Sequence, residues 1–130
     1  MPYTANFLAY VTFTGSMTVY FGGEIIRLAA IPGSHDQTDI MVYFTKLGLV
    51  CLGDISYGMN FPSIDGYTGN LLKYPEVIDR VLALIPDTTI IVSGHGRETT
   101  VEELRQFKNM IGDTSRLVRE TLPSGIMKDH

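Results

Sequence analysis

The chain has 130 residues, of which 45% are hydrophobic and 18% are charged, and it contains a single cysteine. This length predicts one domain, spanning residues 1–130, with a modest core. A net charge of −4 and the lack of a Lys/Arg cluster argue against nucleic acid or an anionic membrane as the main partner. One cysteine excludes an internal disulfide, and no apolar run has the length of a membrane span, so we expect a cytoplasmic protein.

Alternating apolar residues and turn residues predict a series of strands in the first half of the chain. Gly22-Gly23 is a strong hairpin signal between two of them. The last two strands are nearly continuous apolar runs, so we expect both to be central and covered on both faces. The predicted strands span 10–14, 17–21, 24–31, 40–44 and 48–52.

The second half reads as a long loop, a helix, a strand and a second helix. Residues 56–69 are rich in Gly, Pro, Ser and Asp and predict an irregular loop. Apolar residues at helical spacing predict a helix over 71–85, and an apolar run predicts a strand over 88–93. This order indicates an α/β (α+β) fold, with a mixed, mainly antiparallel sheet of about six strands and helices on one face.

The closing helix has two possible starts and two possible ends. Two overlapping capping boxes, Thr99/Glu102 and Thr100/Glu103, both mark its beginning. It either breaks at Gly112-Asp113 or continues toward Leu122.

Three ligand-type side chains lie on loops beside predicted strands. Asp54 follows a strand directly, in Gly53-Asp54, and His95 stands between two glycines after the strand over 88–93. His35 lies in the Pro-Gly-Ser-His loop that ends an earlier strand. Two imidazoles and a carboxylate at strand ends suit a divalent transition metal.

From about residue 17 to about residue 122, the chain resembles the C-terminal half of a metallo-β-lactamase-fold hydrolase. The motifs that carry the resemblance occur in order: the Gly-Gly hairpin, the Pro-Gly-Ser-His loop, a strand pair ending in Gly-Asp, Phe61-Pro-Ser-Ile-Asp65, a helix, Pro-Asp, an apolar strand and Gly-His-Gly. The resemblance implies one half of the αββα sandwich of that family.

The resemblance also implies a role for each candidate ligand. The family's counterpart of His35 binds one zinc of a dinuclear site, that of Asp54 bridges both metals, and that of His95 binds the second. A metal-bound hydroxide then hydrolyses an ester, thioester, lactam or phosphoester. The implied cofactor is therefore Zn²⁺, with His35, Asp54 and His95 as its ligands.

Two departures from the family pattern limit this expectation. Asp36-Gln37 stand between His35 and Thr38, where the family has threonine directly after the histidine. The His-x-His-x-Asp-His motif of the family's first half is absent from the sequence. We therefore expect weak or partial zinc binding, and hydrolysis by the isolated chain that is weak or absent, so that its status as an enzyme stays open.

The missing first half also leaves one sheet face without its partner sheet. We expect an exposed apolar face there, covered by a second copy in a homodimer. A separate protein that carries the first half is the alternative partner. The corresponding alternative functions are a non-catalytic dimeric binding module and one subunit of a split metallo-hydrolase.

Three further side chains flank the expected cleft and are candidates for contact with a ligand: Tyr57, Tyr67 and Arg97. Asp65 is a fourth candidate, because the resemblance implies that it supports the loop near the site. Ordinary loop packing is the alternative for each of them, and an Asx-turn is an equal alternative for Asp65. Cys51 lies inside an apolar strand, so we expect a buried, inert thiol rather than a nucleophile.

Overall fold

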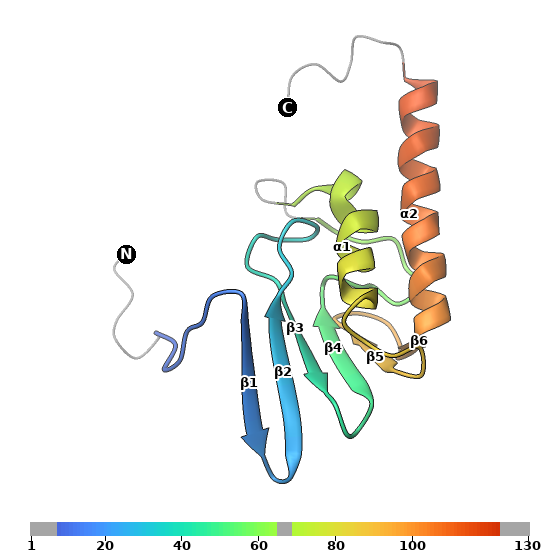
Figure 1. Ribbon diagram of the computed structural model, residues 1–130. Coiled ribbons are helices and arrows are strands. Elements are labelled where there is room, and N and C mark those ends of the chain that lie inside the picture. Colours follow the sequence, from blue (N-terminus) through green and yellow to red (C-terminus); the bar gives the residue numbers. More distant parts are fainter. Residues whose placement is uncertain (1–7, 65–68, 123–130) are drawn as a thin grey trace.

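The computed structural model describes residues 8–64 and 69–122, in which six strands form one sheet and the helices lie on one of its faces (Figure 1). The strands are neighbours in chain order, and only β4 and β5 pair in parallel among the described pairs. The elements are β1 (Ser16–Phe21), β2 (Glu24–Ala30), β3 (Ile40–Phe44), β4 (Leu49–Gly53), the 3₁₀ helix η2 (Leu71–Lys73), α1 (Tyr74–Leu82), β5 (Ile90–Ser93), β6 (Thr99–Thr100) and α2 (Val101–Thr121).

This architecture confirms the predicted fold class: a mixed, mainly antiparallel sheet with two α-helices. The Gly22-Gly23 hairpin forms as expected, with both glycines at positive φ, where a side chain would be strained. The closing helix does not break at Gly112 but runs unbroken from Val101 to Thr121. None of the described helices combines the length and the apolarity that a membrane span requires.

Two strand assignments differ from the sequence prediction. Residues 10–14 form no strand, and Tyr10 and Val11 are largely exposed. The first paired residue is Ser16, opposite Ala29, and no strand lies beyond β1 to pair with the segment before it within the described residues. Alternation alone was therefore a misleading signal. The two-residue strand β6 was missed because it is too short to show any period.

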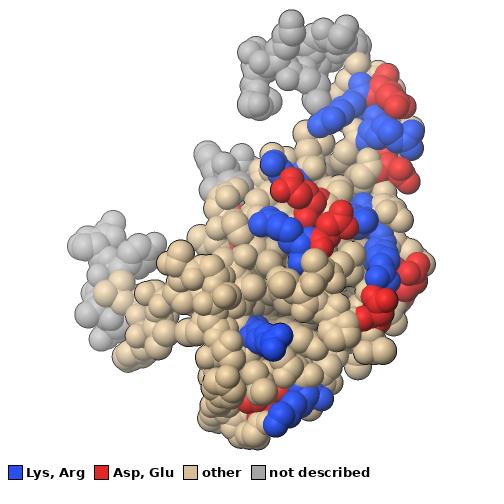
Figure 2. Space-filling model, viewed as in Figure 1, with Lys and Arg blue, Asp and Glu red and all other residues tan. Residues whose placement is uncertain are grey.

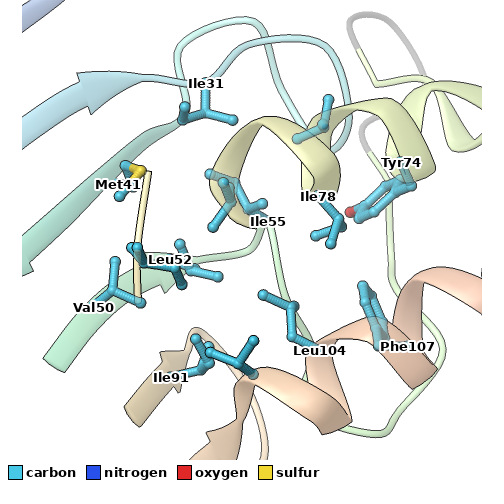
Figure 3. Close-up of a cluster of buried hydrophobic side chains, with 14 of the residues drawn as sticks. Ile31, Met41, Val50, Leu52, Ile55, Tyr74, Ile78, Ile91, Leu104 and Phe107 are labelled. Carbon is cyan, nitrogen blue, oxygen red and sulfur yellow. The ribbon is translucent and has the colours of Figure 1, made fainter. Parts of the chain in front are cut away.

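The core lies between the sheet and the two helices (Figure 3). Alternate residues of the central strands point toward the helices and are fully buried, among them Met41, Val50, Leu52 and Ile91. They pack with one side of each helix, where Ile78 of α1 and Leu104 and Phe107 of α2 are equally buried. The ring of Phe107 meets that of Tyr74 edge-on, at 6.1 Å between centroids.

The opposite side of the sheet, here called the open face, has no covering layer among the described residues. The strand register places Phe21, Leu28, Val42, Phe44, Cys51 and Val92 on it. None of these side chains is buried. The expectation that residues 40–44 and 48–52 are covered on both faces is therefore wrong for the described chain, because its helices supply a cover for one side only.

The second of the two predicted capping boxes starts α2. The Thr100 side chain accepts from the Glu103 backbone N–H, and the Glu103 carboxylate accepts from the Thr100 backbone N–H. Arg97 also pairs with Glu103. The Arg97 guanidinium, followed by the Thr100 backbone N–H, lowers the pKa of Glu103 to about 2.

This shift predicts acid sensitivity at the start of α2. The folded-state pKa of Glu103 lies below its ordinary value, so its contribution to stability is present above pH 4.5 and is lost as the pH falls toward 2. Glu103→Gln should therefore flatten the loss of thermal stability between these two pH values. Melting followed by circular dichroism across this range measures it. Glu102→Gln, outside the capping box, is the matched control, and an equal flattening in both variants would contradict the prediction.

Candidate metal centre

Two parallel strands end side by side and place two candidate ligands at one edge of the sheet. β4 ends at Gly53, directly before Asp54, and β5 ends at Ser93, directly before His95 and its flanking glycines. Because parallel neighbours point the same way, their carboxyl ends meet at a common edge. The φ of Gly53 is 52°, a left-handed value that permits the sharp exit from β4.

Gly94 leaves the space that the Asp54 carboxylate occupies. Its backbone N–H donates to the Gly53 carbonyl over 2.6 Å, which ties the two strand ends together. A Cβ at this position would lie 2.0 Å from Oδ1 of Asp54 and 2.8 Å from the carbonyl carbon of Gly53. Glycine is thus required here for the carboxylate to lie across the end of β5.

Asp54 lies between two histidines, and each histidine faces a different carboxylate oxygen. Oδ2 of Asp54 is 3.5 Å from Nε2 of His35, and Oδ1 is 3.4 Å from Nε2 of His95. The His35 and Asp54 side chains are 24% and 31% exposed, whereas His95 is 60% exposed. The structure therefore brings together all three residues that the sequence singled out as metal ligands, in a cluster open to solvent.

Asp39 orients His35, and sequence reasoning missed it. One Asp39 oxygen lies 3.4 Å from Nδ1 of His35, and the other accepts from the Asp36 backbone N–H over 2.8 Å. The Asp36 carboxylate in turn accepts from the backbone and the hydroxyl of Thr38, both over 2.7 Å. Asp36, the first of the two inserted residues, is thus held within the loop by hydrogen bonds. A carboxylate behind a histidine ligand fixes its tautomer and its ring orientation.

Tyr57 packs against His95 and Asp54. Its side chain is only 7% exposed, and its ring stacks on the His95 imidazole with centroids 4.8 Å apart and planes inclined by 16°. Burial, then the charge of Asp54 and a hydrogen bond to its side chain, raises the pKa of Tyr57. Tyr57 therefore supports two of the three candidate ligands, and its contact with a bound ligand stays a prediction.

Tyr74 anchors the same strand end from the helix layer and was also missed by sequence reasoning. Its hydroxyl donates to the backbone carbonyl of Asp54 over 3.2 Å, although the residue belongs to α1. The side chain is completely buried, and this burial raises the pKa of Tyr74 well above its usual range. A helical apolar stripe predicts that position 74 is buried, but it does not indicate which carbonyl the hydroxyl meets.

The other proposed contact residues lie elsewhere or outside the described residues. The Arg97 guanidinium is engaged with Glu103, 2.5 Å away, and with the Glu98 carbonyl, both at the start of α2. Asp65 and Tyr67 fall outside the described residues. Cys51 is opposite Val42 and therefore lies on the open face rather than at this edge. It is partly exposed, so the expectation of a buried thiol is wrong, because the described helices do not cover that face.

The donor set suits zinc, and the geometry suits two ions rather than one. Zinc takes four ligands in a tetrahedron, and two donors on one ion stand about 3.4 Å apart. Both His–Asp54 pairs have this spacing, but they use different oxygens. Residues 8–64 and 69–122 contain no group of three His, Cys, Asp or Glu side chains placed to hold one ion. Each His–Asp54 pair thus has the spacing of two donors to one zinc, but no single ion position joins all three described residues.

Comparison with known proteins gives the fold. No protein-family model matches the sequence. An uncharacterized protein of Aquifex aeolicus (strain VF5) is 28% identical in a 98-residue alignment that covers 70% of this chain and 46% of that protein. The structure of a metallo-β-lactamase from Pontibacter korlensis superimposes with a TM-score of 0.69 at 19% identity, over 78% of this chain and 48% of that one. The fold is that of part of a metallo-β-lactamase.

Two further solved structures give the same result. TMB-1 matches with a TM-score of 0.67 at 20% identity, over 82% of this chain and 49% of that protein. VMB-1 matches with a TM-score of 0.59 at 18% identity, over 69% of this chain and 42% of that protein. The chain spans about half the length of the proteins it matches. The metallo-β-lactamase fold is thereby confirmed in part, over the share that this chain covers.

Replacing Gly94 should disturb the site through simple crowding. We expect Gly94→Ala to lower the free energy of unfolding by about 1–3 kcal/mol, because a Cβ there meets Asp54 and the Gly53 backbone. Urea denaturation measures this value. Gly112→Ala is the matched control: its Cβ meets only Pro75, at 3.8 Å, and alanine stabilises a helix interior by about 0.5–1 kcal/mol. Equal effects of the two substitutions would contradict the role given to Gly94.

The Tyr57 stack predicts a change in the magnetic environment of one histidine. In Tyr57→Leu the aromatic ring above His95 is lost, so the His95 imidazole protons should lose their ring-current shift. Tyr57→Phe keeps the ring and should keep the shift. Proton–nitrogen NMR of the histidine side chains measures it, with His35 as the internal reference. If Tyr57→Leu changes the imidazole chemical shifts of both histidines, or of neither, this arrangement is contradicted.

Proposed function

We propose that this chain carries one side of a two-zinc hydrolytic site, with His35, Asp54 and His95 as ligands. The reaction class is hydrolysis of an ester, thioester, lactam or phosphoester bond. The observation that supports this proposal is the division of the Asp54 carboxylate, whose two oxygens face two different histidines at 3.5 and 3.4 Å. A carboxylate placed in this way can be shared between two ions.

The residues of the chain have separate tasks in this proposal. Zinc bound there would lower the pKa of water toward neutrality and polarise a carbonyl or phosphoryl oxygen. Asp39 lies against the far nitrogen of the His35 ring, and Tyr57 stacks on the His95 ring. Gly94 keeps the space in which the carboxylate lies. These contacts orient the ligands before any metal binds.

The described part of the chain supplies two donors for each ion, and zinc needs about four. We therefore propose that the isolated chain binds zinc weakly and has little or no hydrolytic activity. Donors outside the described residues that complete the ligand set of each ion would restore tight zinc binding and hydrolytic activity. One subunit of a split hydrolase is the form of this proposal in which a second polypeptide provides those donors.

A non-catalytic dimeric module is the second candidate function. The open face favours it, since an uncovered apolar sheet is typical of an interaction surface. The two candidates make different demands on the strand-end cluster. A hydrolytic origin requires that the cluster binds metal, whereas a module that acts only through its sheet does not.

Zinc titration tests the proposed site. A four-ligand structural zinc site contributes about 10–16 kcal/mol, so half a ligand set should give about 5–8 kcal/mol, or a Kd of about 1–200 µM. Asp54→Ala removes the carboxylate from both pairs and should abolish binding. His35→Ala and His95→Ala should each leave one His–Asp54 pair, and zinc binding should be weaker than in the unaltered chain. Isothermal titration calorimetry of the whole chain measures these affinities.

The control is Asp113→Ala, which removes an exposed carboxylate on α2 and should leave zinc binding unchanged. Nanomolar, stoichiometric binding that Asp54→Ala abolishes would contradict the half-site, because it would show a complete ligand set in one chain. Absence of binding at about 1 mM zinc would contradict the metal site itself and favour the interaction module.

A further inference from the structure

The open face is a feature of the fold that the candidate site does not use. It is formed by alternate residues of β1–β5, on the side of the sheet away from the helices (Figure 1). Its side chains are nearly all apolar, yet Phe21 is 75% exposed, Ile90 48% and Ile40 38%. On the helix side of β3 and β5, Met41 and Ile91 are at most 2% exposed, although Tyr20 on that side of β1 is 78% exposed. Both faces of β3 and β5 are apolar, and they differ in exposure because the helices cover only one of them.

The face carries no free charge that a charged partner would recognise. Glu24 is the acidic residue that the register places on it, at the β1–β2 turn. Its carboxylate accepts from the backbone N–H groups of Ile25, Lys46 and Leu47, over 2.7, 2.9 and 3.0 Å. On the side of the molecule that Figure 2 shows, most charged side chains gather over the helices. The partner surface must therefore be apolar and uncharged as well.

The area of the face is enough for a specific interface. A strand residue occupies about 16 Å² of the sheet plane, given a rise of about 3.3 Å and a spacing of about 4.8 Å. β1 to β5 contain 6, 7, 5, 5 and 4 residues, which corresponds to about 430 Å² of plane. Two such faces bury about 860 Å² of plane, and protruding side chains bring the accessible area to the roughly 1,000 Å² that a specific interface needs.

We propose that the open face binds the open face of a second copy, giving a symmetric dimer of two sheets packed face to face. An apolar, uncharged patch is complementary to itself, so a twofold contact needs no separate partner surface. The two sheets then lie about 10 Å apart, with the helices of each copy on the outside. The strand-end cluster lies at the sheet edge and takes no part in this contact.

The oligomeric state of the purified whole chain tests the proposal. Light scattering should give twice the mass of 14.4 kDa at about 100 µM. Val42 lies between Leu28 and Cys51 at the centre of the face. Val42→Arg should raise the dimer dissociation constant at least about 100-fold, because it would bury an unpaired charge. Leu117→Arg, at an exposed position on α2, is the control and should leave the dimer intact.

Cys51 gives a second measurement that needs no variant. It is the sole cysteine in the sequence and lies on the open face. Its reaction with a maleimide should slow about tenfold between about 1 and 100 µM chain, as the dimer forms and covers it. If the Val42→Arg variant does not fold, the concentration dependence of the Cys51 reaction rate still tests the proposed dimer.

Three outcomes would overturn the proposal. The first is that the purified chain is a monomer at about 100 µM. The same holds if its open face binds a different protein instead of a second copy. The second is a dimer that survives Val42→Arg in a folded variant. The third is a dimer in which Cys51 reacts at a rate independent of concentration. Zinc titration of the dimer separates this proposal from the metal site, since the face can pair whether or not the cluster binds metal.

Discussion

The parallel pairing of β4 with β5 is the constraint on which the candidate site depends. It is the one parallel contact among the described strands, and it brings the segments after Gly53 and after Ser93 to the same edge. An antiparallel partner would have carried its following loop to the opposite end of the sheet. The register shift after Cys51 and the glycine at 94 then let Asp54 lie across the end of the neighbouring strand. Backbone geometry, more than any one side chain, thus creates the cluster.

A one-sided cover shapes the rest of the molecule. Residues of β3 and β4 are apolar on both sides of the sheet, a pattern typical of strands buried on two faces. Only Met41, Tyr43, Val50 and Leu52 find a helix layer. The same pattern that made these strands easy to predict also led to the wrong expectation about their burial. The pattern of apolar residues shows that a strand is suited to burial on two faces. Whether both faces are buried depends on which other elements pack against the sheet.

Much of the architecture could be predicted from the sequence, because hairpins and amphipathic helices leave local signals. Gly22-Gly23 and the Thr100/Glu103 box are examples. The juxtaposition of His35, Asp54 and His95 followed from strand ends and from the resemblance. The contacts that hold these three residues did not, because they are long-range or depend on loop geometry. Asp39 turns back on His35 within an irregular loop, and Tyr74 reaches Asp54 from a helix twenty residues later.

The open face and the proposed metal site are separate features of one chain. An apolar sheet of the right size can cover the face, because apolar packing has no strict direction. Zinc coordination requires nitrogen, oxygen or sulfur ligands at defined positions around the ion. Face-to-face pairing of two copies would bury the exposed strands without bringing new donors to Asp54, which lies at the edge. Stability and chemistry can therefore be supplied by different neighbours. A chain of this kind can be stably folded in one assembly and chemically competent only in another.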